Sequence, residues 1–145
     1  MYIRKLKLKL GEILLQIAPL HLEQLKEALI FQEKQYPARA LGEILIEKGY
    51  IDNDDVETAL GIQQGYPYIS VSNYKIEPKI FRKIPLDLMW KFVFVPLDLL
   101  RNVLTIAIAS PHNKAAIIEE LKNYKVRIFI SSHDEIKEAL KNHGG

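Results

Sequence analysis

The sequence predicts an α+β fold in which tandem helical hairpins precede a small α/β sandwich. Two observations lead to this prediction: a repeat fills residues 10–63, and after residue 65 the apolar spacing changes from helical to short β-branched runs. With 145 residues, 48% of them hydrophobic, the chain can form one domain or two small ones. We expect a duplicated helical subdomain at 1–65 and an α+β subdomain at 66–145, packed as one unit.

The first half contains the same pattern twice. Residues 10–32 read LGEILLQIAPLHLEQLKEALIFQ, and residues 41–63 read LGEILIEKGYIDNDDVETALGIQ. A shift of about 31 residues aligns them, and the matching positions follow helical spacing up to Gln32 and Gln63. We interpret this as a tandem duplication.

Each copy predicts a short helix, a turn and a longer helix. In the second copy the apolar stripe of 41–48 ends at Gly49, a residue that favours helix C-termini. Asp52 then suits the cap of the next helix, and Gly65 stops it. In the first copy His21 takes the cap position. The copies therefore predict two helical hairpins.

The second half predicts the order strand, helix, strand, strand, helix, strand, helix. The expected strands are 68–72, 92–96, 103–109 and 126–130, and the expected helices are 78–91, 113–123 and a final one. Ser132 is the expected cap of that final helix, with Glu135 as its third residue. The segment LDLLRN joins the middle two strands as a hairpin, so this half reads as an α+β sandwich.

Leucines occupy the expected hairpin turn, where polar residues are usual. Leu97, Leu99 and Leu100 either form an exposed apolar patch for a partner or fold under the sheet. The residues alone leave both interpretations open.

The start of the chain alternates Lys5, Lys7 and Lys9 with leucines. Such a segment suits anionic lipid headgroups, ligand phosphates or an acidic partner. A leading segment with a solvated basic face explains the same pattern, and we favour that explanation.

Composition excludes several classes of protein. Lys+Arg 20 against Asp+Glu 18 supplies no global charge for binding nucleic acid, and the absence of cysteine excludes disulfides and Cys-ligated zinc. The longest apolar runs are far shorter than the roughly 20 residues of a membrane span. We expect a soluble, cytoplasmic protein without a nucleic-acid partner.

Catalytic motifs are missing from the sequence. It has neither the G-x-x-x-x-G-K-[ST] phosphate loop nor H-E-x-x-H. The histidines are scattered over expected turns and helix starts: His21, His112, His133 and His143. We read His133, Asp134 and Glu135 as the first turn of a helix, where acids favour the macrodipole. The sequence predicts no enzyme, no catalytic residue and no metal site.

The doubled LGE pattern is followed by QGYPYISV, the pair Ile84-Pro85 and LTIAIASPHN. Together these resemble the N-terminal domain of type II secretion and type IV pilus assembly ATPases, the MshEN-like domain, over essentially the whole chain. The resemblance implies a non-catalytic adaptor or regulatory domain. Its implied partners are secretion or pilus platform and ATPase proteins, through which it associates peripherally with the inner membrane.

The same resemblance implies an alternative, a sensor domain that binds cyclic di-GMP as ligand. Some relatives bind it through an Arg-Leu-Gly motif that ends in Leu, Leu and Gln. The positions of this chain that match or adjoin the motif are Lys9, Leu10, Gly11, Gln32, Arg39, Leu41, Gly42, Gly49 and Gln63.

Several motif positions depart from that pattern. Lys9 and Ala40 stand where arginine is expected, Ala18 replaces a glycine, and Arg39 falls one place early. A guanidinium stacks on a guanine and forms a two-pronged hydrogen-bond fork, whereas lysine offers only a point charge. These substitutions favour the adaptor function over the sensor.

Overall fold

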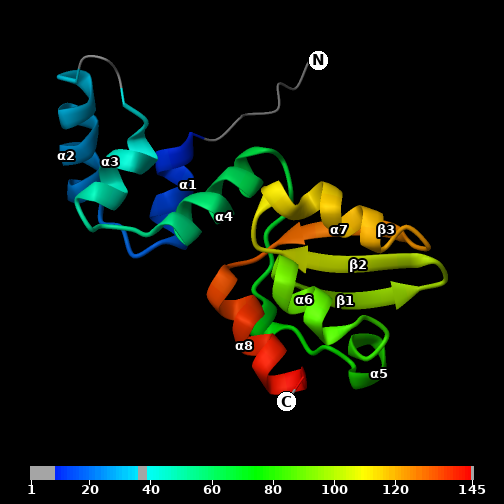
Figure 1. The fold of residues 1–145 in the computed structure, drawn as a ribbon. Helices are drawn as coiled ribbons and strands as arrows, with labels where there is room; N and C mark the ends of the chain where they lie inside the picture. Colours follow the sequence, from blue (N-terminus) through cyan, green and yellow to red (C-terminus); the bar gives the residue numbers. More distant parts are fainter. Residues whose placement is uncertain (1–8, 36–38, 145) are drawn as a thin grey trace, which may run out of the picture.

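The computed structural model describes residues 9–35 and 39–144. It has the α+β fold that the sequence predicts, with helices in both halves and a three-stranded sheet in the second (Figure 1). The first half contains α1 Leu10–Ile17, α2 Leu22–Glu33, α3 Leu41–Glu47 and α4 Asn53–Gln63. The second contains α5 Pro78–Phe81, α6 Leu86–Phe92, β1 Phe94–Leu100, β2 Val103–Ile108, α7 Lys114–Glu120, β3 Lys125–Ile130 and α8 His133–Gly144.

The four helices of the first half form where both copies predict them, and their caps explain the boundaries. At α4 the Asp52 carboxylate accepts a hydrogen bond from the Asp55 backbone N–H at 2.8 Å. In turn, the Asp52 backbone N–H donates to the Asp55 carboxylate at 3.1 Å. At α2 the His21 backbone N–H donates to Gln24 Oε1 at 2.9 Å. The predicted caps at Asp52 and His21 are confirmed.

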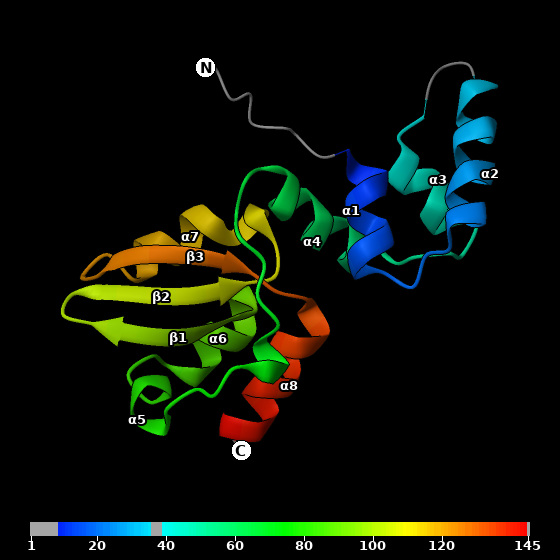
Figure 2. The ribbon, with the colours of Figure 1, turned by 180° about the vertical axis from the view of Figure 1, so that it is seen from behind.

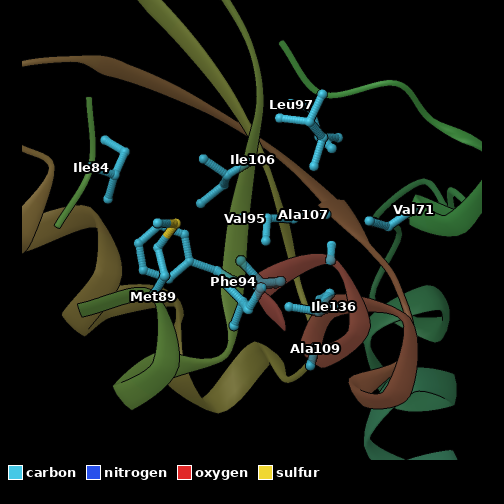
Figure 3. Packing of buried hydrophobic residues seen from close by; sticks show 14 of the residues in the cluster. Val71, Ile84, Met89, Phe94, Val95, Leu97, Ile106, Ala107, Ala109 and Ile136 are labelled. Atoms are coloured by element: carbon cyan, nitrogen blue, oxygen red, sulfur yellow. The ribbon is translucent and has the colours of Figure 1, made fainter. Parts of the chain in front are cut away.

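The sheet has the order β1-β2-β3, antiparallel between β1 and β2 and parallel between β2 and β3. The parallel pair requires the crossover through α7. Side chains from α6, β1, β2 and α8 gather in one buried cluster, which includes Met89, Phe94, Ile106 and Ile136 (Figure 3). These β-branched and aromatic runs suit strands, and their buried side chains contribute to this cluster.

The opening strand predicted at 68–72 is wrong. Tyr68 forms only an isolated bridge to Ile130, and a 3₁₀ turn at Val71–Asn73 follows. The Ile69 N–H still donates to the Ile130 carbonyl at 2.9 Å, so pairing begins at the end of β3 but does not continue. Further along, the Val71 N–H donates to Ser131 Oγ at 3.4 Å and the Ser72 N–H donates to the Glu135 carboxylate at 3.1 Å, so neither continues the ladder.

Glu135, on the first turn of α8, holds this segment in place. Its carboxylate accepts hydrogen bonds from the Tyr68 hydroxyl at 3.1 Å, from the Ser70 hydroxyl and from the Ser132 hydroxyl at 3.3 Å. Burial acts to raise the pKa of Glu135, but the bonds from Ser70, Ser72 and Tyr68 outweigh burial and leave that pKa below its ordinary value. The predicted cap is also confirmed, because the Glu135 N–H donates to Ser132 Oγ at 3.2 Å.

The single helix predicted at 78–91 is two helices, α5 and α6. The break falls at Ile84-Pro85, and Pro85 stands at the N-terminal cap of α6. Proline has no backbone N–H to donate to the preceding turn and disfavours the helical conformation in the residue before it. The correction follows from a residue that was visible in the sequence.

The hairpin between β1 and β2 is tighter than predicted. β1 continues to Leu100, so only Arg101 and Asn102 form the turn, with Arg101 at a φ of 57°. The expected leucine-rich turn is therefore wrong, because the leucines belong to the strand. Leu97 is buried and Leu99 is half-buried, whereas Leu100 is 69% exposed. Leu97 and Leu99 thus fold into the sheet, and Leu100 alone of the three is exposed.

Helix α4 connects the two halves, as Figures 1 and 2 both show. Each half has its own buried apolar cluster, and Ile62 of α4 packs against both clusters. A Cβ added to Gly61 would lie 2.5 Å from Ile130 Cδ1, so α4 rests directly on the end of β3. The exact division at residue 65 stays a prediction. Among the helices of the described ranges, none has the length and apolarity to cross a bilayer.

Candidate functional site

The two copies of the repeat pack reciprocally. Helix α1 lies against α4, and α2 lies against α3, so the first helix of each copy contacts the second helix of the other. In the repeat alignment Leu10 corresponds to Leu41 and Gly11 to Gly42. This arrangement brings the first residues of both copies to the same place in the fold.

Gly11 and Gly42 lie where these helices meet. A Cβ on Gly11 would lie 3.0 Å from Leu25 Cδ1 and 3.5 Å from Leu41 Cδ2. A Cβ on Gly42 would lie 3.3 Å from both methyls of Val56 and 4.0 Å from Leu10 Cδ2. Each glycine therefore has the second helix of its own copy on one side and the first leucine of the other copy nearby. Close helix packing explains both glycines without a ligand.

A depression of about 270 Å³ opens beside Gly11. Its walls are mostly apolar, and they include the motif positions Lys9, Leu10, Gly11 and Leu41. The other lining residues are Glu12, Leu25 and Leu29. Lys9, at the cap of α1, is an exposed cation at its margin. The depression is suited to apolar groups with one charge at the edge.

Lys9, Leu10, Gly11 and Leu41 were predicted as site residues from the sequence. Leu25 and Leu29 match the two leucines of the ligand motif but were not selected as site residues, and Glu12 was not predicted. The missing leucines carry a signal in the sequence, because Leu25 and Leu29 match Val56 and Leu60 in the second copy. Leu29 is also 41% exposed, and two further apolar residues of α2, Leu22 and Ile30, are 52% and 56% exposed. Helix α2 thus extends the apolar surface beyond the depression.

Gln32 and Arg39 lie outside this lining and are engaged with the chain itself. Gln32 Nε2 donates to the Arg39 carbonyl at 2.8 Å, which ties the end of α2 to the start of the second copy. The Arg39 guanidinium pairs with the Glu47 carboxylate at 2.5 Å. Of the candidate motif residues, these two therefore contribute to the junction between the copies. Gln63, the last residue of α4, also lies outside the lining.

Gly49 adopts a left-handed backbone conformation at the end of α3. Its φ is 78°, and the Tyr50 N–H donates to the Leu45 carbonyl at 3.0 Å, which closes the C-terminus of α3. Apart from its chain neighbours, no heavy atom of residues 9–35 or 39–144 lies within 4 Å of a Cβ added there, so conformation rather than space requires glycine. In the first copy Ala18 has a φ of −114° and needs no glycine. The predicted helix stop at Gly49 is confirmed.

Glu27 of α2 joins the copies from the other side. It accepts a hydrogen bond from the Tyr50 hydroxyl at 2.9 Å and pairs with the Lys48 ammonium at 3.2 Å. The bond from Tyr50, and then the contacts with Lys48, hold the pKa of Glu27 below its ordinary value. Lys48 also lies 4.7 Å from the centre of the Phe31 ring.

This chain is similar in sequence to a known domain family and to a pilus assembly ATPase. A family model of the MshEN domain matches residues 64–145. The type IV pilus assembly ATPase PilB of Myxococcus xanthus (strain DK1622) is 26% identical over 137 residues, which is 93% of this chain and 24% of PilB. The chain therefore spans about a quarter of the length of this curated relative.

Solved structures share the fold. A structure of MshE with cdg, the abbreviation of cyclic di-GMP, has a TM-score of 0.61 and 20% identity, covering 94% of this chain and 99% of that chain. The N-terminal domain of XpsE in crystal form I4122 has a TM-score of 0.53 and 18% identity, covering 97% of this chain and 98% of that one. At these sequence identities, the similarity to the solved structures shows a shared fold.

Proposed function

Because this chain belongs to the MshEN domain family, we propose that it is a non-catalytic adaptor domain of a pilus or secretion ATPase system. Its work is to bind protein components of that assembly at the cytoplasmic face of the inner membrane. The family match and the 26% identity to the matching part of PilB support this proposal.

The observation that carries the proposal is the apolar surface of α2. Leu22 and Ile30 are more than half exposed, and Leu29 is exposed at the margin of the depression beside Gly11. Exposed apolar side chains that adjoin an apolar depression are typical of a surface that a protein partner covers. Lys9 adds one positive charge at the edge, where it favours an acidic residue on the partner.

Capture of purified pilus or secretion components from the same organism tests this function. We expect Leu29→Glu to reduce capture by at least tenfold, because it places a charge in an apolar contact. The matched control is Ile118→Glu, which changes another exposed apolar residue, 38% exposed, on α7. Equal capture by the Leu29 and Ile118 variants, or capture of no component at all by the unaltered chain, would contradict the proposal.

Binding of cyclic di-GMP is the alternative function, and one observation supports it. The depression is lined by Leu10 and Gly11, which match the ligand motif of the relatives, and by Lys9 at the position where that motif has arginine. Lys9 and Ala40 lack the planar guanidinium that recognises guanine, and Arg39 is paired with Glu47. We therefore expect no heat of binding with cyclic di-GMP at micromolar protein, and binding in the double variant Lys9→Arg and Ala40→Arg. Micromolar binding by the unaltered chain would make this the principal function.

The proposal also holds that the chain does not hydrolyse nucleotides. No phosphate-binding loop motif occurs in the sequence. Incubation with ATP and Mg²⁺ should release phosphate at the rate of the buffer blank. Turnover that one carboxylate substitution abolished would overturn this part of the proposal.

A further inference from the structure

Three side chains with metal-ligating atoms meet where the two halves of the chain join. His133 Nε2 lies 3.0 Å from Glu57 Oε2 and 3.7 Å from Asp54 Oδ1. One ligand atom from each of the three residues lies within 4.8 Å of the other two. The residues come from α4 in the helical half and from α8 in the α+β half, so the cluster exists only in the folded chain.

Each residue is positioned by its helix. Asp54 and Glu57 are three residues apart on α4, which places them on the same face. His133 is the first residue of α8, directly after the Ser132 cap. Its side chain is 10% exposed, against 24% for Glu57 and 45% for Asp54. The cluster is therefore buried at the histidine and open to solvent at Asp54.

Capping does not explain this cluster. The carboxylates that cap α4 are those of Asp52 and Asp55, which exchange hydrogen bonds with each other's backbone N–H. Asp54, between them in the first turn, faces His133 instead. On the α8 side, Glu135 and Ser132 form the cap. The sequence interpretation of this region as helix starts is thus incomplete.

The charges and donors of the cluster favour a cation. Among the described residues, neither Asp54 nor Glu57 has a lysine or arginine ion-pair partner, so with a neutral imidazole the site carries two uncompensated negative charges. The second oxygen of Glu57 accepts a hydrogen bond from Asn53 Nδ2 at 3.2 Å, which orients the carboxylate. The ring faces both carboxylates through Nε2, and its Nδ1 is buried without a hydrogen-bond partner among the residues that the structure describes.

We propose that Asp54, Glu57 and His133 bind a divalent transition-metal ion of the zinc class, which joins α4 to α8. One imidazole nitrogen and two carboxylate oxygens are ligands that Zn²⁺ accepts, and the open side at Asp54 leaves room for water as a fourth ligand. Bound there, the ion fastens the helical half to the α+β half. This role is separate from partner binding by α2.

Calorimetric titration of the chelator-treated protein with Zn²⁺ at pH 7.5 tests the site. We expect one saturable site with micromolar affinity, and visible absorption of bound Co²⁺ in a parallel titration. His133→Ala and Glu57→Gln should each weaken binding at least tenfold, because each removes one of three ligands. The matched control, His112→Ala, changes an exposed histidine of the same half and should bind as the unaltered chain does.

Thermal unfolding supplies a second readout. Saturating Zn²⁺ should raise the melting temperature of the unaltered chain and of His112→Ala by about 5 °C or more, and leave Glu57→Gln unchanged. If His133→Ala fails to fold by circular dichroism, Asp54→Asn replaces it. The proposal is overturned if no saturable binding occurs, if the variants bind as tightly as the control, or if Zn²⁺ leaves the melting temperature unaltered, because the cluster is then a simple ion pair.

Discussion

Helices α2 and α4 are the second helices of the two repeat copies. They share one sequence pattern, but corresponding residues differ in burial. Ile30 of α2 corresponds to Gly61 of α4: Ile30 is 56% exposed, whereas Gly61 is buried under Ile130 of β3. Likewise Glu27 is exposed on α2, and its counterpart Thr58 is 2% exposed on α4. Helix α4 therefore forms an internal interface with the sheet, whereas α2 keeps its apolar residues on the surface.

The contrast between α2 and α4 indicates where a partner would bind. The face of α4 that packs on the end of β3 is not free for another protein, whereas α2 presents exposed aliphatic residues that a partner can cover. The comparison also separates two causes of glycine in the repeat. Gly61 is required by a neighbour from the second half, and Gly11 and Gly42 by the packing of the copies on each other.

The largest effect is expected where α4 meets β3. Gly61→Leu should lower the free energy of unfolding by about 3 kcal/mol, because the new side chain overlaps Ile130 in a packed interface. The matched change in the other copy, Ile30→Gly, should cost only about 1 kcal/mol, the helix-propensity penalty of glycine. Urea unfolding measures both. Similar costs at the two positions would mean that α4 is not the internal interface.

The caps of the same two helices give the next largest difference. Asp52→Ala removes the carboxylate that accepts the Asp55 N–H and should cost about 1 kcal/mol. At α2 the cap bond is donated by the His21 backbone, so His21→Ala should change stability by less than about 0.5 kcal/mol. Thermal unfolding of the pair of variants checks this. A larger loss of stability in His21→Ala than in Asp52→Ala would contradict the prediction that the Asp52 side chain contributes more to its cap.

The repeat glycines should differ more modestly. Gly42→Ala brings a methyl to 3.3 Å from both branches of Val56, a stiff side chain, and should cost about 0.5 kcal/mol after the gain in helix propensity. At Gly11 the nearest atom, 3.0 Å away, is the end of Leu25, which can change rotamer. Gly11→Ala should therefore be close to neutral in urea unfolding. A greater loss at Gly11 would show that Leu25 is held as rigidly as Val56.

The smallest effect concerns the contact of Glu27 with Tyr50 and Lys48. Because folding lowers the pKa of Glu27, its contribution to stability is present above the unfolded-state pKa and is lost as pH falls through the folded-state value. Melting temperatures from pH 6 to pH 3 should therefore fall slightly less in Glu27→Gln than in the unaltered chain. Glu23→Gln, at an exposed position on the same helix, is the control. Parallel curves for all three proteins would remove Glu27 as a link between the copies.

The sequence predicted those parts of the fold that local chemistry decides. Both helical hairpins, the caps at His21, Asp52 and Ser132 and the three strands of the sheet were all predicted. The break at Pro85 was predictable too, because proline cannot continue a helix, but the apolar spacing on both sides concealed it.

Other features depended on partners far away in the chain. The alternating pattern of 68–72 is that of a strand, yet Glu135, more than sixty residues later, takes its donors and turns the segment. No local rule anticipates such a competitor. In the candidate site, the sequence identified Lys9, Leu10, Gly11 and Leu41 together, whereas the depression they line with Leu25 and Leu29 required the reciprocal packing of the copies.

The duplication, the α+β class and the helix caps at His21, Asp52 and Ser132 follow from the sequence, because periodicity and capping act between residues a few positions apart. Only the tertiary structure decided which copy is buried and which is exposed, since both copies carry the same apolar stripe. It also decided that His133 meets Asp54 and Glu57. Contacts of this kind depend on how whole elements pack, and burial by a distant neighbour leaves no periodic trace in the chain.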